Sequence, residues 1–407
     1  MALVVQKFGG TSVADLERIE AVALRVRQAV LAGDRVAVVV SAMAGTTNQL
    51  VAWAREAGGA DPDLAEYDVV VASGEQVTIG LLALTLRRHG VPARSFLGWQ
   101  VAVETDGRHG GARISAIDAA AVLDVLAGGA VAVVAGFQGV SPERRVTTLG
   151  RGGSDTSAVA LAAALRADRC DIYTDVEGVF TSDPRIVAKA RKLERITYEE
   201  MLEMASLGAK VLQTRSVALA MQHGVRVQVL SSFTDHPGTL VVDESEIVEQ
   251  QVVSGIAYTR DEAKVTLVGV ADRPGVAATI FGPLAEAGIN VDMIVQSVSA
   301  DGVQTDLTFT VSRAEMARTC QLLERSRDEL GFSRIDAQGE VVKISVIGVG
   351  MRSHAGIAHT MFRTLAERGI NIQAISTSEI KISILIDEAY TELALRLLHT
   401  AYGLDAV

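Results

Sequence analysis

The chain has 407 residues, of which 49% are hydrophobic and 4% aromatic, and its formal net charge is -11. This length exceeds what one hydrophobic core normally serves, so we expect two or three domains whose cores are filled by Val, Leu, Ile and Ala, a composition that favours α/β layering. The negative charge and the lack of a basic run argue against a nucleic-acid partner, because such binding depends on concentrated Lys and Arg.

The cysteine content fits a reducing compartment, and the apolar segments fit a protein outside the membrane. Cys170 and Cys320 are the only cysteines, and without a Cys-x-x-Cys or His-Glu-x-x-His motif neither a disulfide framework nor a structural zinc site is indicated. The N-terminus lacks the features of a secretion signal, and charge or glycine interrupts each apolar run before it reaches membrane-spanning length. We therefore expect a cytoplasmic protein.

The N-terminal part of the chain alternates predicted strands and helices. Val4–Phe8 is typical of a strand, a glycine turn follows it, and apolar residues then recur at helical spacing as far as Val30. The β-branched runs Val36–Val40 and Val131–Ala135 predict strands buried on both faces, and Ile172–Asp175 predicts a shorter one. This alternation indicates an α/β fold with parallel strands, whose functional groups gather in loops beyond the carboxyl ends of the strands.

An internal repeat follows an acidic linker. Lys264–Val270 matches Lys343–Val349, and Leu284–Val291 matches Leu365–Ile372. Each copy continues with a further strand and a second amphipathic helix, so we expect two related modules of β-α-β-β-α type. The predicted divisions of the chain are residues 1–243 for an N-terminal domain, 244–262 for the linker, 263–335 for the first module and 336–407 for the second.

Lys7 and the glycines after it are the first candidate for chemistry. The amides of Gly9 and Gly10 can approach phosphate oxygens closely, while a nearby ammonium offsets charge on a transferred group. A lysine that points to water before an ordinary tight turn explains the same residues, and taken alone the motif favours that simpler interpretation.

A second cluster, Gly150–Asp155, places a guanidinium, flexible glycines and polar side chains directly before a predicted helix. An anion meets backbone donors and a bidentate guanidinium there. A helix cap explains Ser154 or Asp155 but not Arg151, so function is favoured. Ser73–Glu75 also opens a helix, and by itself it is best explained as a cap. Neither glycine cluster completes a Walker loop or a Gly-x-Gly-x-x-Gly motif, which disfavours a Rossmann dinucleotide site.

Together these residues resemble the aspartate kinases, members of the amino-acid kinase family. The resemblance covers nearly the whole chain, because the repeated tail is similar to the paired ACT domains of the same enzymes. It implies the amino-acid kinase fold, a mainly parallel sheet sandwiched by helices, followed by two small α+β ACT modules. The motifs that carry the resemblance are Lys7–Val13, Ser41–Met43, Ser73–Glu75, Gly150–Asp155, Tyr173–Gly178, Asp183–Arg185 and Gly208–Lys210.

The resemblance implies that MgATP phosphorylates the β-carboxylate of L-aspartate to give 4-phospho-L-aspartate, the first step toward lysine, threonine and methionine. No covalent enzyme intermediate is expected. Lys7 would stabilise charge on the moving phosphoryl group, and Asp155 would orient Lys7, in keeping with phosphoryl transfer that depends on positioning and electrostatics. Mg²⁺ would be held by ATP oxygens and water, so no metal ligand is expected from the protein.

The resemblance also assigns residues to the two substrates. Arg151 would pair with the α-carboxylate of aspartate and Glu75 with its ammonium, while Ser41, Thr47 and Ser154 would complete a polar pocket. Many relatives have Tyr at the position of Phe180, and His-Pro at the positions of Gln213 and Thr214. The implied nucleotide-binding residues are Gly9, Gly10, Thr11, Thr174, Asp175, Phe180, Arg185 and Lys210.

The paired ACT tail implies feedback regulation by lysine, threonine or both, bound between modules of neighbouring subunits, and hence a homo- or hetero-oligomer. The coupling expected between effector and kinase is roughly 1–3 kcal/mol. A turn residue after a helix-ending glycine explains Asn290 or Asn371 as well. The implied effector-binding residues are Asp272, Ala277, Asn290, Asp292, Gln296, Thr305, Asn371 and Ser378.

Two other functions remain open at this point. One is an amino-acid sensor that binds nucleotide without turning it over, although the presence of Lys7, Glu75, Arg151 and Asp155 argues against it. The other is a kinase of a different small acceptor, such as glutamate, acetylglutamate, carbamate or a nucleoside monophosphate. Members of the family with those acceptors generally lack a paired ACT tail.

Overall fold

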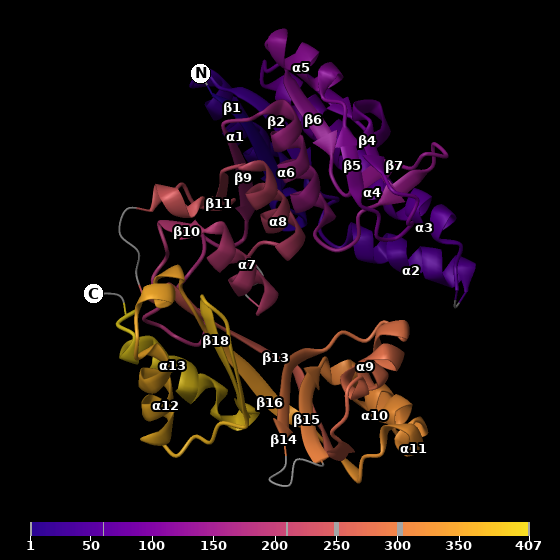
Figure 1. Ribbon diagram of the computed structural model, residues 1–407. Coiled ribbons are helices and arrows are strands. Elements are labelled where there is room, and N and C mark those ends of the chain that lie inside the picture. The colour runs from indigo at the N-terminus through magenta and orange to yellow at the C-terminus, as the bar shows by residue number, and fades with distance from the viewer. Residues whose placement is uncertain (1, 60, 209–210, 248–251, 299–303, 406–407) are drawn as a thin grey trace. The chain divides into compact units, whose positions relative to one another are not determined.

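The computed structural model describes the chain except for residues 1, 60, 209–210, 248–251, 299–303 and 406–407. The chain folds into two compact units (Figure 1). Each unit contains its own main sheet and hydrophobic core. The first unit comprises Met1–Val179, Lys192–Ser206 and Lys210–Val248, and the second comprises Phe180–Arg191, Leu207–Ala209 and Glu249–Val407.

A mainly parallel sheet of eight strands is the centre of the first unit. Its central strands are uninterrupted runs of buried residues, and such strands are stable only between two covering layers. The pair β11–β12 is antiparallel, and the other neighbouring pairs are parallel. In order across the sheet, the strands are β10 (Arg195–Thr197), β12 (Thr239–Val242), β11 (Val227–Ser231), β9 (Arg169–Thr174), β1 (Leu3–Phe8), β2 (Arg35–Val40), β6 (Val131–Ala135) and β3 (Ala93–Phe96).

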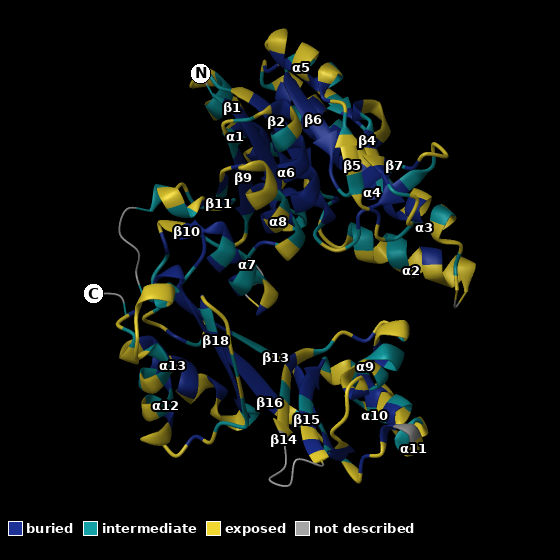
Figure 2. Ribbon diagram, viewed as in Figure 1, coloured by how far each residue is buried: buried dark blue, intermediate teal, exposed yellow. Residues whose placement is uncertain are grey.

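Helices cover both faces of this sheet. On one face, α1 (Leu16–Leu31) and α4 (Ser73–Arg88) pack together, and both contact the side of β2 that carries Val38. Because side chains alternate along a strand, Val39 points to the opposite face, where α6 (Gly153–Leu165) packs on β1, β2 and β9. Figure 2 shows these strands and α6 as the most continuously buried part of the unit. The predicted α/β arrangement is confirmed.

A smaller sheet and shorter helices surround this core. The glycine turn predicted after the first strand is a 3-10 helix, η1, and Asp15 caps the helix that follows by accepting the amide of Arg18. The remaining elements of this unit are α2 (Thr46–Gly58), α3 (Leu64–Val71), α5 (Ala120–Ala127), α7 (Tyr198–Ser206), α8 (Thr214–His223), η1 (Gly10–Val13), η2 (Gly98–Val101), η3 (Glu244–Glu246), and a sheet of β5 (Ile114–Ile117), β4 (Val103–Thr105), β7 (Gln138–Val140) and β8 (Val146–Thr148).

The helical stretch Leu64–Arg88, which contains α3 and α4, is long and apolar enough to cross a membrane by length and composition. This differs from the expectation that charge or glycine interrupts each apolar run. Half of its most apolar window is buried, and Ile79, Leu82 and Leu86 of α4 pack in the core against the main sheet. The apolar composition of this stretch is therefore explained by its place beside the sheet.

Six antiparallel strands form the sheet of the second unit. Helices of the two modules pack over two separate cores. The strands, in order across the sheet, are β14 (Asp292–Val298), β15 (Gln304–Val311), β13 (Gly255–Ala271), β16 (Arg334–Ile347), β18 (Lys381–Asp387) and β17 (Ala374–Thr377). The helices are α9 (Val276–Glu286), η4 (Arg313–Glu315), α10 (Met316–Arg325), α11 (Arg327–Leu330), η5 (Val349–Ser353), α12 (Ile357–Ala366), η6 (Glu388–Tyr390) and α13 (Thr391–Ala401).

The sequence repeat relates the two halves of this sheet. β13 corresponds to β16, β15 to β18 and β14 to β17, so the strand order reads the same from either edge. Equivalent lysines cross between the modules: Lys264 donates to Gln373 Oε1 at 2.7 Å, and Lys343 donates to Asp292 Oδ2 at 2.7 Å. Gln373 and Asp292 are themselves equivalent in the repeat. The two predicted α+β modules are confirmed, and each contributes a side chain to the other.

The core of the second module includes residues from outside the tail. Val187, Val253 and Ile256 pack in the same core as α12 and α13. The segment Phe180–Arg191 belongs to the second unit, although it lies within the predicted N-terminal domain of residues 1–243. The long strands β13 and β16 also run across the predicted boundaries at residues 262 and 335.

Candidate active site

Neighbouring strands of the main sheet end at one edge, and candidate residues follow them. Phe8 of β1 is in register with Val40 of β2 and with Tyr173 of β9, and Val40 is in register with Ala135 of β6. The amide of Ser41, the first residue after β2, donates to Phe8 O at 3.1 Å. The carboxyl ends of four parallel strands therefore meet here, where α/β proteins place their ligands.

Lys7 and Asp155 form an ion pair at this edge. Lys7 Nζ lies 2.5 Å from Asp155 Oδ1, and the two side chains are 11% and 12% exposed. Asp155 lies in the first turn of α6, where the helix dipole favours a negative charge. Because burial removes hydration from both groups, each charge depends on the other, and the carboxylate fixes the direction of the ammonium. The structure thus brings together the two residues predicted to be catalytic.

Two glycines leave space beside this ammonium. A Cβ atom on Gly9 would lie 3.5 Å from Lys7 Nζ, and one on Gly10 would lie 3.0 Å from the carbonyl oxygen of Ala42. The amide of Gly9 makes a long hydrogen bond of 3.4 Å to Tyr173 O, and Gly10 opens η1. A side chain at Gly9 would therefore lie against the ammonium of Lys7, and one at Gly10 would press on the backbone of Ala42.

Arg151 lies in a tight turn that needs glycine on both sides. Gly150 and Gly152 have φ angles of 73° and 72°, in the region where a side chain is strained. A Cβ atom on Gly152 would also lie 2.1 Å from Cγ of Gln213. Arg151 is exposed, and no hydrogen bond or ion pair joins its guanidinium to another residue in the described part of the chain. The guanidinium is therefore free to take a carboxylate in a bidentate pair.

Glu75 presents a buried carboxylate with one unused oxygen. The residue is 2% exposed and lies in the first turn of α4. Its Oε1 accepts the amide of Ala42 at 3.1 Å, whereas its Oε2 has no hydrogen-bond partner among the described residues. Burial raises the pKa of Glu75 to about 8, against the opposing effect of backbone hydrogen bonds from Glu75 and Ala42. A buried carboxylate of this kind is stabilised by a ligand that brings a cation.

The predicted hydroxyl residues lie around the same strand ends. Ser154 is 9% exposed, and a Cβ atom on Gly136, the residue after β6, would come within 2.8 Å of its Cβ. Ser41 is half-buried directly after β2, and Thr47 is half-buried in the first turn of α2. Ser41 and Ser154 therefore lie at the strand ends, whereas Thr47 lies in the helix that follows β2.

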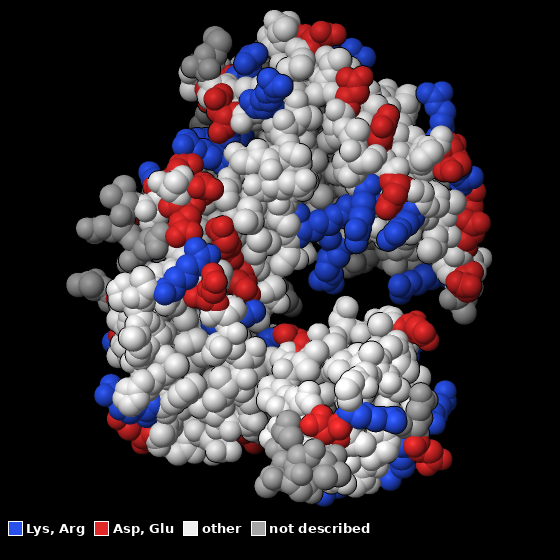
Figure 3. All heavy atoms as spheres, viewed as in Figure 1, with Lys and Arg blue, Asp and Glu red and all other residues white. Residues whose placement is uncertain are grey.

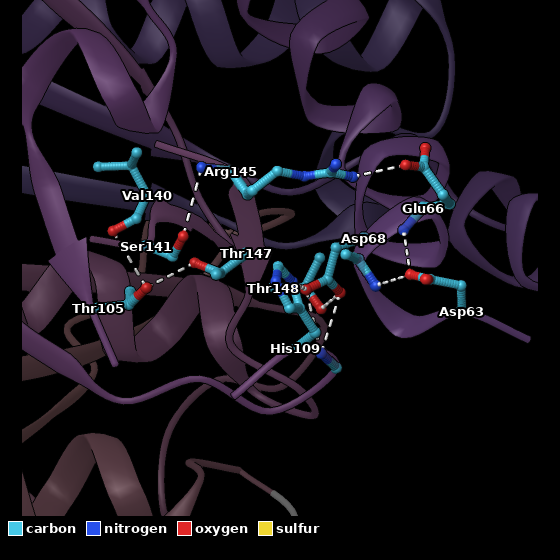
Figure 4. A network of polar contacts seen from close by, with 12 residues as sticks. Asp63, Glu66, Asp68, Thr105, His109, Val140, Ser141, Arg145, Thr147 and Thr148 are labelled. Atoms are coloured by element: carbon cyan, nitrogen blue, oxygen red, sulfur yellow. Dashed lines mark hydrogen bonds and ion pairs between the residues drawn. The ribbon is translucent and has the colours of Figure 1, made fainter. Parts of the chain in front are cut away.

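A polar network that sequence analysis missed surrounds Asp68, and Figure 4 shows its members His109 and Thr148. Asp68 of α3 is fully buried, and its carboxylate accepts Thr148 Oγ1 at 2.5 Å and His109 Nδ1 at 2.8 Å. The amide of Gly110 donates to both oxygens of Asp68 at 3.1 Å. Ala112 then donates its amide to Thr148 O at 2.8 Å. The segment around Gly110 is therefore tied to the strand that leads into Arg151.

Arg215 of α8 adds a second constraint on the same segments. Its guanidinium donates to the carbonyl oxygens of Leu149 and Ala112, each at 2.8 Å. In sequence, Asp68 is signalled only as a lone acid beside the apolar run Val69–Val71. Arg215 carries no such signal, because its partners are backbone carbonyls distant in the chain.

The predicted nucleotide residues are distributed between the two units. Thr174 ends β9 and donates its hydroxyl to Asp175 Oδ1 at 3.0 Å, and Thr11 is exposed in η1. Phe180 and Arg185 belong to the second unit, where Arg185 makes two side-chain hydrogen bonds to Asp183, at 3.0 and 2.8 Å. Lys210 lies outside the described residues.

Most of the predicted effector residues are exposed. Thr305 differs, because it is 1% exposed and its hydroxyl donates to Ser297 O at 3.1 Å. Burial raises the pKa of Asp292, but the hydrogen bond and charge of Lys343 outweigh that effect and lower it overall. The other predicted effector residues, all exposed, are Asp272, Ala277, Asn290, Gln296, Asn371 and Ser378.

Comparison with known proteins identifies the family. The model of the amino acid kinase family matches residues 2–231, and the ACT domain model matches residues 265–326 and 344–402. The chain is 55% identical over 408 residues to an aspartate kinase of Pseudomonas fluorescens (strain SBW25), a match that covers 100% of this chain and 98% of the relative. The chain belongs to the aspartate kinase family.

Solved structures of this family agree with the fold. E. coli aspartokinase III in complex with aspartate and ADP, in the R-state, matches with a TM-score of 0.82 and 29% identity over 98% of this chain and 99% of that one. The same enzyme with lysine and aspartate, in the T-state, matches with a TM-score of 0.78 and 30% identity over the same shares. The predicted family, fold class and phosphotransferase class are confirmed, whereas the roles given to individual residues stay predictions.

Proposed function

We propose that the chain transfers the γ-phosphoryl group of MgATP to the β-carboxylate of L-aspartate, giving 4-phospho-L-aspartate and ADP. The observation that carries this proposal is the buried Lys7–Asp155 pair beside the strand ends. Ala42 connects that pair to Glu75, because its carbonyl oxygen lies against Gly10 and its amide donates to Glu75 Oε1. The structure of E. coli aspartokinase III named above contains aspartate and ADP, which supports the same pair of ligands here.

Aspartate recognition follows from the charges of the pocket. The unused Oε2 of Glu75 would accept the substrate ammonium, and Arg151 would take the α-carboxylate in a bidentate pair. Two opposite charges select a zwitterion, and the β-carboxylate is then the substrate group left to face Lys7. Ser41, Thr47 and Ser154 would supply the remaining hydrogen bonds.

The transfer itself needs no general base. Aspartate's β-carboxylate is already ionised at neutral pH, so one of its oxygens attacks the γ-phosphorus directly while the bond from that phosphorus to the bridging oxygen breaks. Charge on the phosphoryl oxygens is spread over the group during transfer, and Lys7 would stabilise it. Asp155 would hold the ammonium of Lys7 in place. In this role the Asp155 carboxylate accepts no proton from the substrate.

Nucleotide binding would involve Thr174, Asp175, Phe180, Arg185 and Lys210, with Gly9 and Gly10 next to the phosphates. No group of three or more His, Cys, Asp or Glu that could hold a metal ion occurs among the residues that the structure describes. A Mg²⁺ ion would arrive on ATP oxygens and water and would neutralise phosphate charge. The protein's own contribution to the phosphates would then be Lys7 and backbone amides.

The ACT tail would make the enzyme responsive to lysine, threonine or both, within an oligomer in the cytoplasm. A relative's structure contains lysine, and exposed residues such as Asn290 and Gln296 lie at the positions assigned to effectors. Equilibrium binding of each effector, with and without aspartate, tests this regulation. Effector affinity that is indifferent to aspartate and nucleotide, together with unchanged activity, would contradict it.

Trapping of the acyl phosphate tests the reaction. Incubation with MgATP, aspartate and hydroxylamine should give the aspartyl hydroxamate, with glutamate and N-acetylglutamate as acceptor controls. Aspartate should give the only strong signal. A stronger signal with another acid would identify a different acceptor, and nucleotide binding without any hydroxamate would favour the sensor.

A further inference from the structure

The segment Phe180–Arg191, here called the nucleotide-side segment, contacts the second ACT module through packing, hydrogen bonds and an ion pair. Val187 packs in the core of that module. Arg396 of α13 donates to Ile186 O at 2.9 Å, and Lys189 pairs with Asp405 at 2.9 Å. Residues near the end of the described chain therefore hold a segment that lies between β9 and β10 in sequence.

A buried histidine makes the innermost of these contacts. His399 of α13 is 0% exposed, and its two ring nitrogens have different partners. Nε2 lies 2.8 Å from Thr181 Oγ1, and Nδ1 lies 2.9 Å from Asp405 Oδ1. Thr181 is bonded through its backbone as well, because its amide donates to Arg191 O at 2.9 Å and its carbonyl accepts the amide of Ile256 at 2.7 Å.

The chemistry of these groups sets the order of donors. A carboxylate only accepts, so Nδ1–H of His399 donates to Asp405; in a neutral imidazole Nε2 then accepts, and the Thr181 hydroxyl donates to it. The same hydroxyl oxygen accepts the amide of Arg191 at 3.0 Å. Hydrogen bonds from His399, then Lys189, lower the pKa of Asp405 to about 2, so it is ionised at neutral pH. Each polar atom of the relay Asp405–His399–Thr181 therefore has a partner.

In sequence, the segment held by the relay contains two of the residues assigned to the nucleotide, Phe180 and Arg185. Phe180 directly precedes Thr181, and Arg185 directly precedes Ile186, whose carbonyl is held by Arg396. Asp183, the partner of the Arg185 guanidinium, also accepts the hydroxyl of Tyr258 at 3.4 Å. A segment that is already fixed loses less conformational entropy when a ligand binds it, and affinity for that ligand rises accordingly.

We propose that His399 and Asp405 are positioning residues for the nucleotide: through Thr181 and Lys189 they hold the nucleotide-side segment in the conformation that binds ATP and ADP. This inference rests on the proposed function, because Phe180 and Arg185 serve the nucleotide only in that scheme. It also gives the second ACT module a direct mechanical connection to nucleotide affinity, separate from any effect on aspartate.

A matched pair of substitutions at Thr181 tests the relay. Thr181→Val keeps the shape of the side chain but removes the hydroxyl, whereas Thr181→Ser keeps the hydroxyl and removes a methyl group. If packing alone mattered, the serine variant would be the weaker one. Asp405→Asn provides a second test. The Asp405 side chain is 23% exposed, so this substitution disturbs folding less than one at the buried Thr181. His359→Gln, at an exposed position of α12, is the surface control.

The measurements are the dissociation constant of ADP, the dissociation constant of aspartate and the KM for ATP, on the full chain after its melting temperature is checked. Thr181→Val and Asp405→Asn should weaken ADP binding by roughly three- to tenfold, as for loss of a buried hydrogen bond, with aspartate binding changed less than about twofold. Thr181→Ser and His359→Gln should resemble the unsubstituted chain.

Equal effects of the valine and serine variants, parallel weakening of aspartate and ADP, or unchanged ADP affinity in Asp405→Asn would each overturn the proposal. Failure of the proposed function has a different signature, because the unsubstituted chain would then form no aspartyl hydroxamate. An active chain whose Thr181→Val variant keeps full ADP affinity would refute the relay and leave the reaction standing.

Discussion

The carboxylate of Glu75 accepts the backbone amide of Ala42 at 3.1 Å and leaves its other oxygen buried without a partner in the described chain. The same Ala42 lies against Gly10, next to the Lys7–Asp155 pair. Only Ala42 therefore lies between Gly10, which is assigned to phosphate, and the buried carboxylate of Glu75, one oxygen of which lacks a hydrogen-bond partner within the part of the chain that the structure describes. Ligand-free, such an arrangement costs stability, and a substrate ammonium would relieve that cost.

Aspartate binding should depend on pH through Glu75. Its pKa is raised to about 8 by burial, so below that pH the free protein carries a proton on this group. Binding of the ammonium requires the ionised form, and affinity for aspartate should therefore rise by up to about tenfold per pH unit as pH increases toward 8. Calorimetry of aspartate binding in buffers of different ionisation heat should detect proton release at pH 7, and Glu75→Gln should abolish it. Absence of proton release in the unsubstituted chain would contradict this role.

Removal of the Glu75 charge should also stabilise the protein. The folded pKa lies above the ordinary value of 4.5, so the folded chain keeps a proton that the unfolded chain loses. Stability therefore declines as pH rises from about 4.5 to about 8, and Glu75→Gln should recover up to about 5 kcal/mol above pH 8 and little at pH 4. Thermal melts at pH 5 and pH 9 check this difference. Aspartate affinity should fall roughly 10- to 100-fold in the same variant, as for loss of a hydrogen bond to a charged group.

Asp68→Asn should loosen the Arg151 turn. The amide keeps the shape of the carboxylate but directs its own N–H groups toward donors of His109, Gly110 or Thr148. We expect a loss of about 1–3 kcal/mol in unfolding free energy and a raised KM for aspartate with a nearly unchanged KM for ATP. Glu66→Gln on the same helix removes only an exposed pair with Arg145 and should cost at most about 1 kcal/mol. Equal changes in the two KM values would argue against a specific effect on Arg151.

The two crossing lysines of the ACT modules provide a matched comparison. Lys343 pairs with the buried Glu262 as well as with Asp292, whereas Lys264 contacts the neutral Gln373. Lys343→Met should therefore destabilise the chain by about 3–5 kcal/mol, because Glu262 would keep a buried charge without its partner. Lys264→Met should cost only about 1 kcal/mol.

The repeat suggests a rescue for that loss. Val341 is the equivalent of Glu262 in the second module. The double variant Lys343→Met/Glu262→Val should regain most of the lost stability in chemical denaturation. Equal losses in the two lysine variants, or no recovery in the double variant, would contradict this explanation.

The residues that sequence analysis identified are those whose chemistry requires a recognisable neighbour. Lys7 was found through the glycines beside it, and Arg151 through the turn that contains it, because close approach of a phosphate or carboxylate restricts several consecutive residues at once. Parallel pairing then placed both motifs at one edge of the sheet. The β-branched runs predicted the strands themselves, since a strand buried on both faces has no polar alternation.

Residues that act across long sequence distances were not found in this way. Asp68 and Arg215 bind partners that are distant in the chain, and the residues beside them in sequence do not identify those partners. His399 is a similar case, because its partner Thr181 is 218 residues away. The grouping of Phe180–Arg191 with the C-terminal unit depends on those contacts, and chain continuity alone assigned the segment to the N-terminal domain.

The rate of phosphoryl transfer in Lys7→Ala tests the proposed chemistry most directly. With MgATP and aspartate saturating, kcat for hydroxamate formation should fall by a factor of roughly 10² to 10³, or about 3–4 kcal/mol in the barrier, as for loss of a group aimed at transition-state charge. Retained binding of aspartate would show that the pocket of this variant is still folded. A loss of less than about tenfold, roughly 1.4 kcal/mol, in a folded variant would contradict the role of Lys7.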